Sequence, residues 1–210
     1  MTDATDQGDV RRALLVIDVQ HEYVDGNLPI AHPPLTTSLP NIEAAIRAAD
    51  AVGVPVLLVQ HVDEEDSPVF AAGSHGAAIL PAIADLPHAA VLTKQTVSAF
   101  PGTGLDNHLN GIDTLTITGF MTQHCVASTT REAADRGLHV EVLSDATGAP
   151  PLDTPQGASS AQDVHEGTLM VLSSGFATVV DTATWLDAVA AGTPLPAPDL
   201  WASTAPAREG

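Results

Sequence analysis

Three side chains of unlike chemistry stand out in this chain: a carboxylate, an ammonium and a thiol. Cys125 is the only cysteine and Lys94 the only lysine of the 210 residues, and Asp18 directly follows the apolar run ALLVI. A thiolate can attack a carbonyl carbon, a carboxylate can move the protons, and an ammonium can stabilise the negative partner. Together these groups could carry out acyl transfer through a thioester.

Each of the three residues also has an ordinary structural role open to it. A lone cysteine is more often a small buried apolar side chain than a catalyst. A single lysine can be a surface residue, although in a chain that otherwise uses arginine it could serve as a compact, tunable ammonium. A carboxylate at the end of a buried strand is costly unless it is paired or takes part in chemistry. Whether each residue has a structural or a catalytic role therefore depends on the secondary-structure elements that position it.

The segment around Cys125 predicts a strand, a turn and a helix. Residues 114–118 alternate in polarity and are bounded by Gly119, and a helical pattern runs from His124 to Gly137. We expect Cys125 in the first helical turn, where the positive end of the helix dipole favours a thiolate. Unpaired backbone N–H groups just before and at Cys125 could form an oxyanion hole.

The rest of the chain alternates strands with helices, which predicts a three-layer α/β/α fold with a six-stranded, mainly parallel sheet. Ligands bind at the carboxyl ends of the strands in such folds. Asp18, Lys94 and Cys125 each stand at or just past such an end, so we expect them to meet. The expected strands are 13–17, 55–59, 89–92, 114–118, 139–143 and 177–180, and the expected helices are 39–51, 105–109, 124–137, 161–173 and 182–190, with a short one within 77–83.

Composition narrows the class of protein. The formal net charge is −19, with 26 acidic and 7 basic residues. Such a surface repels nucleic acid and anionic membranes, so we expect neither as a partner. Either a high-salt cytoplasm or the bias of a GC-rich genome could produce it. A polar N-terminus, no apolar run of about 20 residues and a single cysteine favour a cytoplasmic protein.

We expect one domain over residues 11–190. Residues 1–10 read as a disordered acidic leader, and residues 191–210 as a Pro/Ala-rich tail or an arm used in oligomer contacts.

Three motifs in order resemble the isochorismatase-like cysteine hydrolases, a family that includes nicotinamidase, ureidoacrylate amidohydrolase, biuret hydrolase and streptothricin hydrolase. They are LLVIDVQ with Asp18, TKQTVSAFPGTGL with Lys94 and TGFMTQHCVASTTREA with Cys125. The resemblance implies an Asp–Lys–Cys triad, a Rossmann-like sheet and a homo-oligomer, dimeric or higher. It also implies a cis peptide bond between Phe120 and Met121 that turns the Met121 N–H into the oxyanion hole beside that of Cys125.

The chain departs from the metal-dependent nicotinamidases, which carry an Asp-x-His pair and further histidines after the second strand. Here that stretch reads His61-Val62-Asp63, with His75 further on. A metal on His61, Asp63 and His75 is conceivable, but polar loop residues are the preferred interpretation. We therefore expect neither a metal nor a cofactor.

Four further side chains leave the same predicted strand ends and could line a substrate pocket or simply pack: Gln20, Tyr23, His61 and Phe100. The preferred function is hydrolysis of a C–N bond in a small amide, ureide or lactam, with Cys125 as nucleophile, Asp18 as base and Lys94 holding Asp18. One alternative is a vinyl-ether hydrolase of the isochorismate type, which would not rely on a cysteine. Another is a non-catalytic member that uses the cleft to bind a ligand or partner.

Overall fold

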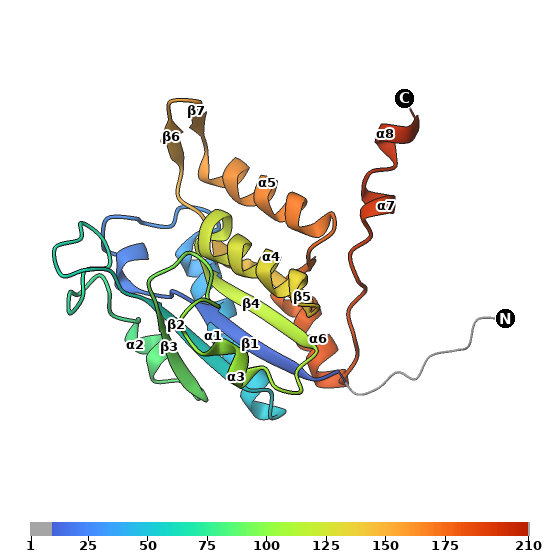
Figure 1. Ribbon diagram of the computed structural model, residues 1–210, viewed down its shortest axis with the longest axis horizontal. Helices are drawn as coiled ribbons and strands as arrows, with labels where there is room; N and C mark the ends of the chain where they lie inside the picture. Colours follow the sequence, from blue (N-terminus) through green and yellow to red (C-terminus); the bar gives the residue numbers. More distant parts are fainter. Residues whose placement is uncertain (1–9, 210) are drawn as a thin grey trace.

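The computed structural model describes residues 10–209 and has a six-stranded parallel sheet at its centre (Figure 1). The strands lie in the order β3-β2-β1-β4-β5-β8, and every neighbouring pair is parallel. The predicted fold class is confirmed. Residues 1–9 of the predicted leader lie outside the described residues. The strands are β1 (Arg12–Ile17), β2 (Val56–His61), β3 (Ala90–Lys94), β4 (Thr114–Phe120), β5 (His139–Gly148) and β8 (Thr178–Val180).

Helices cover both faces of the sheet. Helices α1 (Leu35–Ala51) and α6 (Thr182–Ala191) pack on one face, and α4 (Ala127–Asp135) and α5 (Ala161–Ser173) lie on the other. Shorter helices occupy the connections: η1 (His21–Tyr23), α2 (Pro81–Ala84), α3 (Leu105–His108) and the π-helical turn η2 (Thr122–Val126).

The two faces of β1 supply two separate cores. Leu14 and Val16 pack with Ile42 and Trp185 on the α1/α6 side, whereas Leu15 and its alternate neighbours pack on the α4/α5 side. A central parallel strand buries side chains on both faces, which is why ALLVI is apolar without alternation. With few aromatic residues available, both cores are built largely from Ala, Val, Leu and Ile.

Gly119 allows the end of β4 to approach β1 closely. Its φ is 100°, and a Cβ at this position would lie 2.0 Å from the carbonyl oxygen of Ile17. Any other residue would push the two strands apart. The segment that follows Gly119 carries Cys125, and the residue that follows Ile17 is Asp18. This glycine therefore brings two of the candidate residues together.

Several boundaries differ from the sequence-based expectation. The segment expected as a loop at 145–160 contains the end of β5 and an antiparallel hairpin, β6 (Leu152–Thr154) with β7 (Gly157–Ser159). Three-residue strands are too short to leave a periodic signal. Helix α1 begins four residues earlier than expected and keeps Pro40 inside its first turns. The N–H of Ser38 already donates to the carbonyl oxygen of Pro34 at 3.1 Å, so Pro40 omits one hydrogen bond from a helix that has already begun.

The C-terminal segment forms an arm that leaves the body of the molecule (Figure 1). It contains the short helices α7 (Leu200–Ser203) and α8 (Pro206–Glu209), and Leu200 and Trp201 are exposed. Within residues 10–209 no helix has the length and apolar character needed to cross a membrane.

Candidate active site

The strand ends place the three candidate residues at one edge of the sheet. Asp18 follows β1, Lys94 is the last residue of β3, and Cys125 lies in the π-helical turn that follows β4. Asp18 has a φ of 52°, an uncommon conformation for a residue with a side chain. The backbone turns sharply there, directly after the buried strand.

Lys94 is the centre of the cluster. Its Nζ lies 2.8 Å from Oδ2 of Asp18 and 3.3 Å from Sγ of Cys125. It also donates to Nδ1 of His61 at 2.8 Å and to the carbonyl oxygen of Thr96 at 3.1 Å. The ammonium is almost completely buried, with 2% of the residue exposed. A point charge in this position can stabilise negative charge on either the carboxylate or the sulfur.

Asp18 is completely buried, and among the described residues neither of its oxygens has a well-directed hydrogen bond. Lys94 holds it as an ion pair. Burial raises the pKa of this carboxyl above its ordinary value, and the Lys94 ammonium opposes that shift. A carboxylate with available lone pairs and a raised pKa is suited to accept a proton from a neighbouring thiol.

The sequence predicts that Cys125 lies in a first helical turn, where a thiolate is favoured. The surroundings of Cys125 in the structure favour the protonated thiol instead. Burial, followed by the negative charge of Asp18, raises the pKa of the thiol to about 12, although Lys94 lowers it. Residues 122–126 form a π-helical turn instead of the first turn of an α-helix, and only 7% of Cys125 is exposed. The thiol therefore keeps its proton at neutral pH and needs a base.

A buried histidine anchors the turn that carries Cys125. His165 on α5 contacts the hydroxyl of Thr122 through Nδ1 at 2.8 Å and the carbonyl oxygen of Ser144 through Nε2 at 3.0 Å. Burial lowers the pKa of His165 to about 4, so the ring is neutral at physiological pH. Its Nε2–H then donates to Ser144, and Nδ1 accepts from Thr122.

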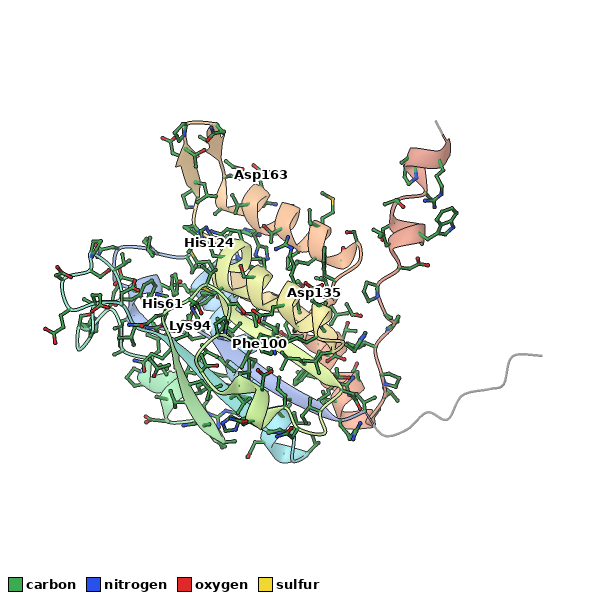
Figure 2. The ribbon with its side chains drawn as sticks, viewed as in Figure 1. His61, Lys94, Phe100, His124, Asp135 and Asp163 are labelled. Atoms are coloured by element: carbon green, nitrogen blue, oxygen red, sulfur yellow. The ribbon has the colours of Figure 1, made fainter. Side chains whose placement is uncertain are left out.

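His61 extends the cluster toward solvent, and Figure 2 shows it beside Lys94 near the strand ends. Because an ammonium can only donate, Nδ1 of His61 must be the acceptor, and its Nε2–H faces Oδ1 of Asp63 at 3.2 Å. Gln20 fixes the backbone of His61, since its amide donates to the His61 carbonyl at 2.8 Å and accepts from the His61 N–H at 2.9 Å. Gln20 is thus fully engaged by backbone groups.

The two predicted aromatic pocket residues lie in different surroundings. Tyr23 is buried against Phe70 and Phe120, with ring centroids 5.2 and 5.7 Å away. Burial raises its pKa well above the ordinary value, and the negative charge of Asp18 adds to the shift. Phe100 is also buried, but its ring packs beneath the guanidinium of Arg136 at 4.2 Å.

The three residues considered for a metal do not converge. His61 and Asp63 are paired, but His75 faces Asp25, with its Nε2 3.1 Å from Oδ2. Within the described part of the chain, the group of side chains spaced for a metal is His21, Asp25 and His75.

The segment before Cys125 adjoins an apolar cleft. The Phe120–Met121 peptide bond is cis, and between residues 10 and 209 no acceptor faces the backbone N–H of Met121. A cleft of about 400 Å³ lies along this segment, lined by Leu28, Pro29, Met121, His124 and Leu152. A second cleft, of about 450 Å³, is lined by Val62, Lys94, Thr96 and Pro101.

Sequence reasoning missed most of these lining residues. Leu28, Pro29 and Leu152 belong to irregular or very short elements that carry no periodic pattern. One signal was available: Thr96 and Pro101 follow the end of β3, at the edge where ligands bind in parallel sheets.

The fold is an α/β architecture whose carboxyl edge brings a buried thiol, carboxylate and ammonium into contact. A sequence profile of the isochorismatase domain matches residues 12–184. The chain therefore belongs to the isochorismatase family of hydrolases.

Relatives extend the match over nearly the whole chain. A candidate isochorismatase from Burkholderia xenovorans LB400, known from its crystal structure, is 46% identical, covers 96% of this chain and 98% of its own, and has a TM-score of 0.92. Nicotinamidase 3 of Arabidopsis thaliana is 32% identical over 80% of this chain and 84% of its own length. The ureidoacrylate amidohydrolase RutB of Methylobacterium radiotolerans is 29% identical over 88% and 81%.

Proposed function

We propose that this protein hydrolyses the C–N bond of a small amide, ureide or lactam through a thioester on Cys125. The observation that carries the proposal is the position of Lys94, whose Nζ contacts both Oδ2 of Asp18 and Sγ of Cys125 inside a buried cluster. Two of the relatives are by name a nicotinamidase and an amidohydrolase, which supports amide chemistry.

In the first half of the reaction, Asp18 accepts the proton of the Cys125 thiol as sulfur attacks the substrate carbonyl carbon. The thiol pKa of about 12 means that proton transfer and attack must be coupled, and Lys94 stabilises the charge that develops on sulfur. The carbonyl oxygen becomes an oxyanion, held by the N–H groups of Met121 and Cys125. When the C–N bond breaks, the leaving nitrogen takes the proton from Asp18.

In the second half, Asp18 accepts a proton from water as the water oxygen attacks the thioester carbonyl. Breaking the C–S bond releases the carboxylic acid, and the proton returns from Asp18 to the sulfur. The sum is one water consumed and one amide split into acid and amine. Asp18 alternates between base and acid, for which its raised pKa is suited.

We propose that the substrate occupies the cleft beside Met121, while Lys94 lines the second cleft. Leu28, Pro29, Met121 and Leu152 give the cleft beside Met121 a mainly apolar wall, and it adjoins the backbone segment that leads to Cys125. A cleft of about 400 Å³ accommodates a small molecule rather than a peptide.

The test is release of ammonia or amine from a panel that contains nicotinamide, biuret, a ureidoacrylate and a streptothricin-type lactam, in low and high salt. Release by the wild type that is lost in both Cys125→Ser and Lys94→Ala supports the proposal and identifies the substrate class. Trapping of an acyl group on Cys125, seen by intact-protein mass spectrometry, would establish the thioester.

Three outcomes would contradict the proposal. Release that persists in Cys125→Ser would exclude a thioester. Turnover of isochorismate without turnover of any amide would instead support the vinyl-ether reaction. Ligand binding without turnover of any panel member would support the non-catalytic alternative.

A further inference from the structure

We infer that His21, Asp25 and His75 form a binding site for a divalent transition-metal ion such as Zn²⁺, separate from the candidate active site. The three side chains come from two distant segments: the β1–α1 connection and the loop between β2 and α2. Their contacts are with one another rather than with Asp18, Lys94 or Cys125.

The distances suit shared coordination. Nδ1 of His21 lies 3.1 Å from Oδ1 of Asp25, and Nε2 of His75 lies 3.2 Å from Oδ1 and 3.1 Å from Oδ2 of the same carboxylate. Ligands at about 2.0–2.2 Å from one tetrahedral ion are separated by about 3.3–3.5 Å. All three ligand atoms lie within 4.8 Å of one another, and the two imidazole rings lie side by side with their centroids 3.9 Å apart.

The backbone on either side of the ligands is already fixed. The N–H of His21 donates to the carbonyl of Ala78 at 3.0 Å, and the N–H of Glu22 donates to that of Gly76 at 2.9 Å. Gly76 is pressed against Glu22, because a Cβ there would lie 2.1 Å from the Glu22 carboxylate. The two segments that carry the ligands are therefore held together without the ion, which reduces the entropy lost on binding.

The donor set selects the kind of metal. Two imidazole nitrogens and one carboxylate suit Zn²⁺, Co²⁺ and Ni²⁺, whereas Mg²⁺ and Ca²⁺ prefer oxygen ligands. Asp25 and His75 are exposed, so water can supply the remaining ligands. The net charge of −19 attracts any divalent cation to this surface. The two imidazoles distinguish this site from the surrounding carboxylates.

A bound ion would join η1 to the β2–α2 loop. That loop carries Phe70, whose ring contacts both His61 and Tyr23. The ion would thus stabilise two segments that flank the candidate active site without touching the reacting groups. This role does not depend on the proposed hydrolysis.

The experiment is calorimetric titration of Zn²⁺ into the full chain, prepared without a polyhistidine tag and in excess Mg²⁺ to occupy surface carboxylates. We expect one site per chain. Loss of a residue that only hydrogen-bonds to a metal ligand typically weakens metal binding about 10–100-fold. His21→Ala and His75→Ala each remove a direct ligand. Each should therefore weaken Zn²⁺ binding at least about tenfold. Titration with Co²⁺ should give a visible absorption band that both variants lose.

Three control variants test whether these three side chains, and no other group of ligands, hold the ion. His108→Ala removes an exposed histidine elsewhere, Asp63→Asn tests the alternative ligands near His61, and Cys125→Ser removes the thiol. All three should bind Zn²⁺ as the wild type does. Equal binding by His75→Ala and the wild type, no binding above the Mg²⁺ background, or a loss only in Cys125→Ser would overturn the inference. The melting temperature in Zn²⁺ should rise for the wild type and not for His75→Ala.

Discussion

The sheet buries two ion pairs, one toward each end of its strands. Arg12 at the start of β1 pairs with Glu141 of β5, and Asp18 after β1 pairs with Lys94 at the end of β3. All four side chains are at most 2% exposed. Because the two pairs are similarly buried in the same sheet, their hydrogen-bond partners can be compared directly.

The Arg12–Glu141 pair is extensively hydrogen-bonded. Arg12 donates to both carboxylate oxygens of Glu141, at 2.8 to 3.2 Å, and to the carbonyl of Thr193 at 2.7 Å. Glu141 also accepts from the hydroxyl of Thr116 at 2.7 Å and the indole N–H of Trp185 at 2.9 Å. Hydrogen bonds lost from water are thus replaced within the protein, which is what a buried ion pair needs to be tolerated.

The Asp18–Lys94 pair lacks that completeness on the carboxylate side. Lys94 has several acceptors, but the oxygens of Asp18 have no well-directed donor within residues 10–209. An under-solvated carboxylate is costly for stability and valuable as a base. The pair at the amino end of the sheet is therefore suited to stabilising the fold, and the pair at the carboxyl end has the under-solvated carboxylate that the proposed hydrolysis needs.

The largest effect should come from breaking the reactive pair. For whichever substrate of the panel is turned over, Asp18→Asn should lower kcat/KM by about 10³-fold. A positioned acid–base group contributes about 10²–10⁴-fold to the rate. In the wild type, kcat/KM should fall on the acid side at a pH above the usual carboxyl range, since a raised pKa means that Asp18 takes up its inactivating proton at higher pH. A pH–rate profile with its acid limb near an ordinary aspartate value would contradict this assignment.

Breaking the other pair should cost stability instead of activity. Glu141→Ala leaves the Arg12 guanidinium buried and unpaired, and should lower the free energy of unfolding by about 3–5 kcal/mol. Urea titration measures this. The matched control is Asp113→Ala, which breaks the neighbouring but exposed Arg11–Asp113 pair and should cost no more than about 1 kcal/mol. A loss of kcat in folded Glu141→Ala as large as in Asp18→Asn would erase the distinction between the two ends.

His165 should make the anchor of the reactive turn sensitive to acid. Its pKa is lowered from 6.5 to about 4, so the folded state binds the proton less tightly than the unfolded chain. The neutral ring contributes fully to stability when the pH is above 6.5, the pKa of His165 in the unfolded chain. That contribution is lost as the pH falls from 6.5 toward about 4, the pKa in the folded state. The loss should approach about 3 kcal/mol at the acid end. His165→Gln should flatten that part of a pH–stability curve, and an unchanged slope would count against a buried neutral histidine.

The smallest effect should come from His61, which contacts Lys94 but not the thiol. His61→Ala removes one acceptor of the ammonium and should lower kcat about tenfold, of the order of one charge-assisted hydrogen bond. His61→Asn offers a side-chain carbonyl in its place and should recover part of the loss. If both variants alter KM alone, His61 contacts substrate and does not position Lys94.

Sequence reasoning placed the reactive end of the sheet better than the stable one. Asp18, Lys94 and Cys125 each end an apolar strand or follow one, so their meeting could be predicted from topology. Glu141 lies inside the predicted strand HVEVL, and a carboxylate in a buried strand was a visible signal of a partner. Its partners Arg12 and Trp185 are 129 and 44 residues away, and no local pattern identifies them.

The state of the thiol was harder to predict than its position. The strand–turn–helix pattern indicated a helix beginning at His124, but the chain forms a π-helical turn from Thr122. That turn is held by His165 from α5 through a long-range contact that sequence spacing does not reveal. The raised pKa of Cys125 also follows from burial and from Asp18, both products of tertiary structure.

The chain's two tryptophans give the protein a built-in pair of optical reporters. Trp185 is completely buried and donates to Glu141, whereas Trp201 in the C-terminal arm is 71% exposed and stacks with Arg208. A collisional quencher such as acrylamide reaches only the second, so emission from the core and from the arm can be separated in one unlabelled sample. The shorter-wavelength emission, from buried Trp185, reports whether the Arg12–Glu141 end of the sheet is intact. The longer-wavelength emission, from exposed Trp201, reports contacts made by the C-terminal arm.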